Sequence, residues 1–154
     1  LQEVFDNRIK FTKGAKALIQ TMKSNGAKAV LVSGGFTFFT ERVAEAVGFD
    51  ENESNLLEFE NGVLTGGVKK PIYDSESKLR ALQFYCEEQG IDESMSMAVG
   101  DGANDSKMIE AAGMGVAFCA KPMLKKLANC SINTPDLKNI LYIQGYKDSE
   151  IIDN

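Results

Sequence analysis

The sequence predicts an α/β fold, a mostly parallel sheet with helices on both of its faces. Short apolar runs that suit buried strands alternate with segments in which apolar residues recur at helical spacing. At 27–32 and at 95–99 an apolar run meets glycine-rich residues and a helical pattern follows, which is typical of a strand–loop–helix unit. The 154 residues suit one ordinary domain, and 44% hydrophobic residues can build its core.

The first part of the chain contains the first of these units. Residues 1–11 suit a connecting segment that ends extended, and Thr12 can cap a helix that continues to about residue 25. The β-branched apolar run at 27–32 is typical of a buried parallel strand, which we expect to end at Ser-Gly-Gly. A second helix is expected at 36–47, because Gly48 can end it.

Residues 55–70 change to the period of a β-hairpin. Asn61-Gly62, between apolar residues, is the strongest short hairpin signal in the chain. Gly66-Gly67 indicates a second turn. The hairpin suits either a flap beside a site or a plain hairpin at the edge of a sheet, and loop statistics do not separate the two.

The remaining chain returns to alternating helices and strands, and its last residues are polar. Residues 145–154 are therefore expected to form a loose tail. The other expected elements are a helix at 75–89, the strand at 95–99, a helix from about 104 to 112, a strand at 115–119, a helix at 122–128, a strand at 131–133 and a helix at 136–142.

Composition excludes several classes of function. The chain has no histidine, so Ser-His-Asp triads, Cys-His pairs and histidine-ligated zinc are excluded, and acid–base chemistry falls to carboxylates, lysine or metal-bound water. A net charge of −5 without a basic block argues against nucleic acid and membrane surfaces as partners. No apolar run approaches the ~18 residues of a membrane-spanning helix. Three cysteines without Cys-x-x-Cys spacing suit a reducing, cytoplasmic compartment.

The polar cluster at 100–105 follows a predicted strand and opens a helix. Asp101 and Asp105 are four positions apart, close enough to serve one site at the carboxyl edge of a parallel sheet. Carboxylate oxygens without histidine or thiolate suit a hard cation such as Mg²⁺. An Asp-Gly turn with a helix cap is the alternative, and it explains Asp101 alone better than it explains the whole cluster.

Two further features can hold a phosphate. Ser33 and Gly34 stand where a strand runs into a helix, and a hydroxyl with exposed backbone N–H groups can cradle an oxyanion. Lys78 lies early in its helix and can neutralise a phosphate as a point charge. Taken singly, these residues also suit an ordinary loop and a solvated surface lysine. Together with the carboxylate cluster they indicate phosphoryl transfer.

Several motifs occur in the same order in a known family. They are Ser-Gly-Gly-Phe-Thr-Phe-Phe at 33–39, Lys78, Gly-Asp-Gly-Ala-Asn-Asp at 100–105 and Ala-Phe-Cys-Ala-Lys-Pro at 117–122. With these motifs, residues 8 to about 143 resemble the latter part of phosphoserine phosphatases of the haloacid dehalogenase superfamily. Only the Gly-Asp-Gly-x-Asn-Asp motif is shared more widely, notably with cation-pumping ATPases. The resemblance implies a Rossmann-type core with a β-hairpin insertion.

The resemblance also implies roles for the phosphate-binding residues. Ser33 and Gly34 would bind the transferring phosphoryl group, and Lys78 would pair with that group and with the nucleophile. In the family, an aspartate attacks phosphorus to give an aspartyl-phosphate, which water then hydrolyses. A second aspartate, two positions later, protonates the leaving alkoxide and then activates the water.

The same resemblance assigns the carboxylate cluster to the metal and to catalysis. Asp101 would ligate Mg²⁺, and Asp105 would support the metal site through its water molecules. Asn104 would contact the substrate.

The sequence departs from its family in one respect. The nucleophile motif Asp-x-Asp-x-Thr should precede these elements, yet no Asp-x-Asp occurs in residues 1–154. The first core strand, which carries that motif, and the cap that recognises the substrate are both missing. In this fold the missing strand lies between the strands at 27–32 and 95–99, so both would present open edges that can pair with another chain. We therefore expect residues 1–154 to be a partial hydrolase core, the C-terminal portion of a longer enzyme.

The expected function is removal of phosphate from O-phosphoserine, the final step of L-serine biosynthesis, with Mg²⁺ as cofactor. The chain by itself is expected to be inactive, because its nucleophile is absent. Its partners would be a small phosphomonoester and, at the open sheet edges, the missing N-terminal segment or a second chain. Two alternatives stay open: an inactive fragment that keeps the metal and phosphate ligands, and another phosphatase or phosphotransferase of the superfamily with a different small substrate.

Overall fold

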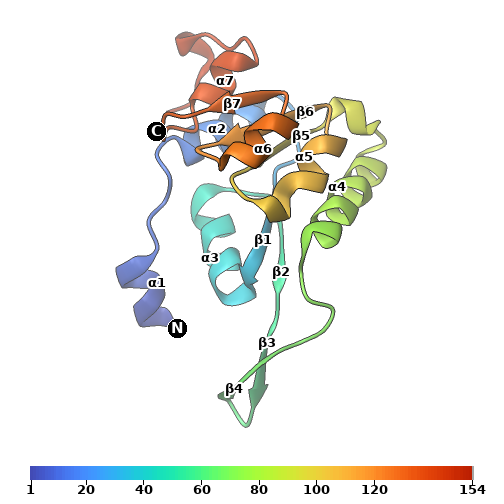
Figure 1. The fold of residues 1–154 in the computed structure, drawn as a ribbon. Helices are drawn as coiled ribbons and strands as arrows, with labels where there is room; N and C mark the ends of the chain where they lie inside the picture. The colour runs from blue at the N-terminus through green and yellow to red at the C-terminus, as the bar shows by residue number, and fades with distance from the viewer. Residues whose placement is uncertain (154) are drawn as a thin grey trace. The chain divides into compact units, whose positions relative to one another are not determined.

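The computed structural model describes residues 1–153 and divides the chain into two compact units (Figure 1). The first unit contains Leu1–Ile72 together with the residues from Asp136 onward. The second unit contains Tyr73–Pro135. The predicted α/β class with parallel strands and helices is confirmed, and each unit is described by itself.

The first unit is built around two parallel strands and the helix between them. The strand β1 (Val30–Phe36) leads through α3 (Thr37–Val47) to β2 (Glu51–Asn55), and α3 packs against both strands. The αL conformation of Gly48, with φ of 100°, ends α3 as predicted. The core of this unit includes Leu18, Ile19, Ala44, Val47, Ile140 and Leu141.

Two expectations for this unit are wrong, and one of its strands was not predicted. Residues 1–11 contain the helix α1 (Gln2–Arg8), which buries no residue of its own. The next helix, α2 (Ala15–Ser24), begins after Gly14 rather than at Thr12. Strand β2 was not predicted, because its sequence Glu-Asn-Glu-Ser-Asn lacks the apolar residues from which strands are recognised.

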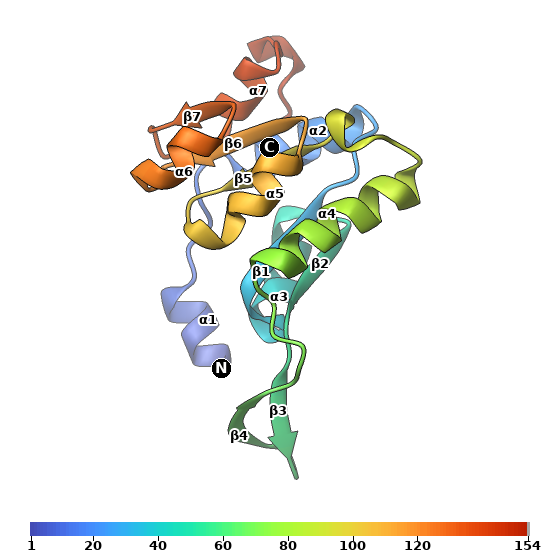
Figure 2. The ribbon, with the colours of Figure 1, turned by 45° about the vertical axis from the view of Figure 1, so that its right-hand side comes forward.

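The hairpin is confirmed, but its second predicted turn is wrong. The strands β3 (Leu57–Glu60) and β4 (Val63–Val68) are antiparallel, and Asn61 and Gly62 join them with φ of 50° and 80°. Gly66 and Gly67 lie inside β4, where the pairing register shifts, so they mark a bulge. Figures 1 and 2 show the hairpin projecting beyond the end of β2.

The C-terminal residues complete the first unit. The helix α7 (Asn139–Ile143) and the 3₁₀ turn η3 (Asp148–Glu150) fall in this segment. Beyond them, the Ile152 backbone N–H donates to Thr21 Oγ1 at 2.9 Å, and Lys138 Nζ lies 2.7 Å from Asp153 Oδ2. Residues 145–153 of the expected loose tail are therefore tied to α2 and α7, and Asn154 lies outside the described residues.

The second unit contains a three-stranded parallel sheet in the order β5-β6-β7. Its helices pack side by side, with α5 against both α4 and α6 (Figure 2). Its core includes Ala98, Met108, Ile109, Ala117 and Leu124. The elements are α4 (Ser75–Gln89), η1 (Glu93–Met95), β5 (Met97–Gly100), η2 (Ala103–Asp105), α5 (Ser106–Ala111), β6 (Met114–Phe118), α6 (Pro122–Leu127) and β7 (Cys130–Ile132).

The two strands expected to flank the missing one each lie at the edge of a sheet. Within residues 1–153, β1 pairs with β2 alone and β5 pairs with β6 alone. Each therefore has one side on which no strand of the described chain forms a ladder. Among the helices of the described residues, none combines the length and apolar character needed to cross a membrane.

Candidate phosphoryl-transfer site

The carboxylate of Asp105 organises the turn that follows β5. Its Oδ2 accepts hydrogen bonds from the backbone N–H groups of Asp101 and Gly102, both at 3.1 Å. The turn passes so close to this side chain that a Cβ on Gly100 would lie 2.5 Å from Cβ and Cγ of Asp105. Glycine at this position is therefore required by the close approach of the backbone to a side chain.

The other oxygen of Asp105 binds Lys78. The Lys78 Nζ atom lies 2.6 Å from Asp105 Oδ1, and each residue is only 5% exposed. A charge buried to this degree is stable only beside an opposite charge, and here each residue provides the opposite charge for the other. The pair links α4 to the turn after β5. The sequence had singled out both residues without pairing them with each other.

Helix α4 presents Lys78 from its first turn. Asp74 caps this helix by accepting from the Ser77 backbone N–H at 2.9 Å and from the Ser77 hydroxyl at 3.0 Å. These two hydrogen bonds lower the pKa of Asp74. The cap fixes the start of α4 and thereby the position from which Lys78 reaches Asp105.

Asp101 and Asn104 are the exposed polar residues of the turn. The carbonyl oxygen of Asp101 accepts from the Lys121 backbone N–H at 3.1 Å, which ties the turn to the loop before α6. Both oxygens of Asp105 are engaged with Lys78 and with the turn, whereas the carboxylate of Asp101 is exposed to solvent. Asp101 is thus the carboxylate of this turn that can meet a cation directly.

The donor set suits Mg²⁺ in type but is small. Its atoms are oxygens, as Mg²⁺ prefers, and this cation usually keeps several water molecules while binding one or two carboxylates. Within residues 1–153, no group of three or more His, Cys, Asp or Glu side chains is placed to hold a metal. The exposed carboxylate of Asp101 is thus a donor of the type that Mg²⁺ takes.

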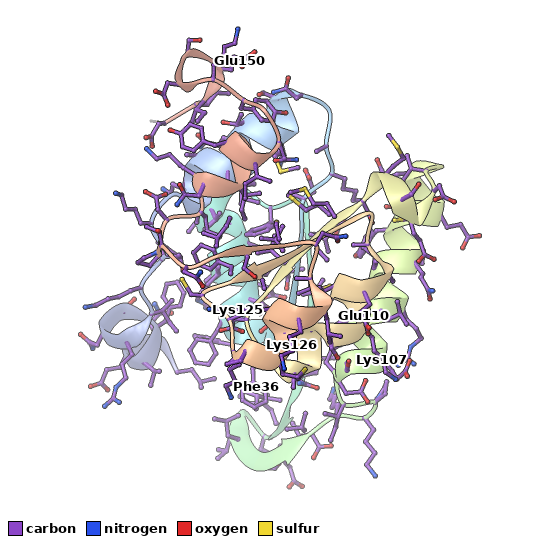
Figure 3. The ribbon with its side chains drawn as sticks, turned by 45° about the horizontal axis from the view of Figure 1, so that its top comes forward. Phe36, Lys107, Glu110, Lys125, Lys126 and Glu150 are labelled. Atoms are coloured by element: carbon purple, nitrogen blue, oxygen red, sulfur yellow. The ribbon has the colours of Figure 1, made fainter. Side chains whose placement is uncertain are left out.

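The surface beside this turn carries several charges. Figure 3 shows Lys125 and Lys126 on α6, and Lys107 and Glu110 on α5. Lys107 forms an ion pair with Glu76 of α4, so α4 and α5 are joined at the surface as well as through the buried pair.

Ser33 and Gly34 lie in the first unit, inside β1 rather than after it. The prediction that the strand ends at Ser33 is wrong, because β1 pairs with β2 again at Phe36. Ser33 Oγ accepts from the Gly35 backbone N–H at 3.0 Å, and Gly34 and Gly35 are exposed. The segment combines a hydroxyl with exposed backbone, and its Gly35 N–H is already bonded to Ser33. The four other predicted site residues belong to the second unit.

Comparison with known proteins identifies the family of this chain. The sequence model of the haloacid dehalogenase-like hydrolases matches residues 1–110. The chain belongs to this hydrolase family.

Relatives within the haloacid dehalogenase-like hydrolases share most of the chain. It is 47% identical over 131 residues to the phosphoserine phosphatase of Archaeoglobus fulgidus, covering 85% of this chain and 38% of that protein. It is 44% identical over 145 residues to the phosphoserine phosphatase of Albidiferax ferrireducens, covering 92% of this chain and 61% of that protein. The chain thus spans less than two thirds of the length of either relative.

A solved structure of this hydrolase family has the same fold. A phospho-aspartyl intermediate analogue of phosphoserine phosphatase superposes with a TM-score of 0.86 at 37% identity. The match covers 92% of this chain and 68% of that one. The likeness to phosphoserine phosphatases, first indicated by the motifs, is confirmed.

Proposed function

We propose that this chain is part of a phosphomonoester hydrolase that removes phosphate from O-phosphoserine. The observation that carries the proposal is the buried pair of Lys78 and Asp105, whose carboxylate also holds the turn of Asp101. A surface lysine or a plain Asp-Gly turn would not need this pair. The similarity to named phosphoserine phosphatases supports the choice of substrate.

The roles proposed for the residues follow from their contacts. Ser33 and Gly34 offer a hydroxyl and exposed backbone to the oxygens of the transferring phosphoryl group. Lys78 brings a positive charge that Asp105 fixes in place, and it is proposed to face the phosphoryl group and the nucleophile. Asn104 is exposed on the same turn as Asp101 and can contact the substrate.

We propose Mg²⁺ as the cofactor, held by Asp101 and supported by Asp105 through water. When bound, this cation neutralises charge that develops on the phosphoryl oxygens. Asp105 contributes by fixing the backbone of Asp101 through its hydrogen bond to the N–H group. The direction of the Asp101 side chain is thereby restrained at its base.

We further propose that the nucleophile comes from outside residues 1–154. No Asp-x-Asp occurs in the sequence, although the family attacks phosphorus with the first aspartate of that motif. The relative described as a phospho-aspartyl intermediate analogue supports an aspartyl-phosphate in the complete enzyme. Residues 1–154 would then form a partial hydrolase core. Hydrolysis of O-phosphoserine yields L-serine, so the enzyme would complete serine synthesis. The free cysteines of the chain suit a reducing compartment, and we therefore propose the cytoplasm as its location.

The test compares two proteins in one assay. The 154-residue chain and a version extended by the encoded residues upstream of Leu1 are incubated with O-phosphoserine and Mg²⁺, and inorganic phosphate is measured. We expect the extended protein to release phosphate, EDTA to stop it, and the 154-residue chain to be inactive. An extended protein that does not hydrolyse O-phosphoserine but hydrolyses another small phosphomonoester would contradict the proposed substrate.

The missing nucleophile also favours a second candidate function. A chain that keeps Lys78, Asp101 and Asp105 but lacks the attacking aspartate can bind phosphate and Mg²⁺ without turnover. Binding of inorganic phosphate by an extended protein that releases none from any substrate would support this candidate.

A further inference from the structure

The segment of Ser33, Gly34 and Gly35 is a bulge in a parallel ladder. Val32 pairs with Glu53 and Phe36 pairs with Asn55, so three residues of β1 face one residue of β2. The extra residues of a bulge are left out of the regular ladder, which cannot fix their conformation. Other contacts must hold the backbone of this segment.

Asn55 supplies such a contact. Its Nδ2 donates to the Gly34 carbonyl oxygen at 2.8 Å, and the residue is only 5% exposed. The bond joins the last residue of β2 to the centre of the bulge. A buried amide is costly to leave without partners, so this side chain strongly favours the bulge conformation that satisfies it.

The backbone of Asn55 is held by the helix that follows the bulge. The Thr37 hydroxyl, in the first turn of α3, donates to the Asn55 carbonyl oxygen at 2.9 Å. Thr37 Oγ1 in turn accepts from the Ser54 hydroxyl at 3.2 Å. Asn55 is therefore fixed at its main chain and bonded to Gly34 at its side chain.

We infer that Asn55 is a positioning residue for phosphate binding. It holds the Gly34 carbonyl and thereby orients the Ser33 hydroxyl and the exposed backbone of the bulge toward an incoming phosphoryl group. The inference rests on the proposed function, in which Ser33 and Gly34 bind that group. Asn55 touches neither substrate nor metal in this scheme and acts through its bond to Gly34.

The experiment titrates the ¹⁵N-labelled 154-residue chain with inorganic phosphate and follows the backbone N–H signals of residues 33–37. Asn55→Ala removes the donor, and Asn55→Asp keeps the shape of the side chain while replacing the donor with an oxygen. We expect each to weaken phosphate binding on the order of fivefold, the effect of losing one hydrogen bond that pre-orders the site. The signal of the Gly34–Gly35 peptide should move even without phosphate.

Asn52 provides the matched control. It lies on the same strand and its Oδ1 accepts from Thr40 Oγ1 at 2.9 Å, so its substitution removes a hydrogen bond to α3 but none to the bulge. Asn52→Ala should lower stability in urea, whereas Asn52→Asp keeps an oxygen that can accept from Thr40. Both variants should leave phosphate affinity within twofold. Asn55→Ala adds no charge, so a loss of phosphate affinity that it shares with Asn55→Asp does not come from electrostatic repulsion.

The outcomes separate this inference from the proposed function. A phosphate affinity of Asn55→Ala equal to that of the wild type would overturn the inference but not the proposed function. Equal weakening by the Asn52 and Asn55 variants would also overturn it, because a general loss of stability would then explain both. A wild-type chain whose residues 33–37 do not respond to phosphate would overturn the inference and the role proposed for Ser33 and Gly34, whereas phosphate release by the extended protein tests the proposed hydrolysis separately.

Discussion

Lys78 Nζ lies 2.6 Å from Asp105 Oδ1, and both side chains are almost completely removed from solvent. Removing either member of such a pair destabilises the protein more than breaking a surface ion pair does, because the remaining charge stays buried without a partner. The same carboxylate holds two N–H groups of the turn after β5. Stability of the second unit and geometry of the proposed metal ligand are therefore linked through one side chain.

Lys78→Met is expected to lower the free energy of unfolding by about 3–5 kcal/mol, because it leaves the Asp105 carboxylate buried without a cation. Urea denaturation measures the loss. Adding Asp105→Asn should cost less than the sum of the two single losses. Arg80→Met is the control on the same helix, where the exposed side chain loses only a partly buried hydrogen bond to Ser77 Oγ and the expected loss is below about 1 kcal/mol. Additive effects of Lys78 and Asp105 would contradict the pairing.

Gly100→Ala is expected to destabilise the turn by about 1–3 kcal/mol, because the new Cβ would overlap the Asp105 side chain. Gly102→Ala is the comparison two positions later. Its Cβ would meet only the end of the Asn104 side chain, with Oδ1 at 3.2 Å. Thermal unfolding of both variants tests the difference. Equal melting temperatures would show that the close approach of Gly100 to Asp105 does not require glycine.

Asp101→Asn is expected to weaken Mg²⁺ binding at least about tenfold, because it removes the charge of the exposed carboxylate proposed as the ligand. Isothermal titration calorimetry of the chain with MgCl₂ gives the affinity. Glu110→Gln removes one exposed charge from α5 and should change that affinity less than twofold. Similar losses of Mg²⁺ affinity in both variants would show that Asp101 acts through its charge in general rather than as a ligand.

Asp74→Ala is expected to make α4 less stable in a pH-dependent way. Hydrogen bonds from the Ser77 N–H and hydroxyl lower the pKa of Asp74 in the folded protein. A lowered folded-state pKa contributes stability above the unfolded pKa, and this contribution disappears as pH falls through the folded value. Melting temperatures of wild type and variant should therefore differ at pH 7 and converge as the pH drops below about 4. A difference that is constant with pH would contradict a cap by the carboxylate.

Local signals predicted most of the secondary structure. Gly48 and Gly90 take the left-handed conformation that ends a helix, and Asn61-Gly62 forms the predicted hairpin turn. These features depend on the residue at the position itself, so one sequence is enough to recognise them.

Features set by distant partners were not predictable in this way. Strand β2 is polar, and side-chain bonds such as that of Asn52 with Thr40 join it to α3. The continuation of β1 through Ser33 depends on its pairing with β2. Helix α1 buries no residue, so no apolar stripe marks it.

The site was predicted as a set of residues but not as a set of contacts. The resemblance gave Lys78 a role toward phosphate, whereas the structure adds its buried partner Asp105. Asn55 carried no signal at all, because an asparagine in a polar segment is typical of a turn. Its contact with Gly34 depends on two strands that meet 21 positions apart in the sequence.

The bond between Lys78 and Asp105 spans 27 positions and has a consequence for the order of folding. Docking of α4 supplies the lysine that this buried carboxylate needs, so we expect the N–H groups of Asp101 and Gly102 to gain most of their protection from hydrogen exchange with that step. Exchange at these two amides would then follow the docking of α4 rather than local fluctuation of the turn. The turn after β5 would therefore report the opening of α4 in the second unit.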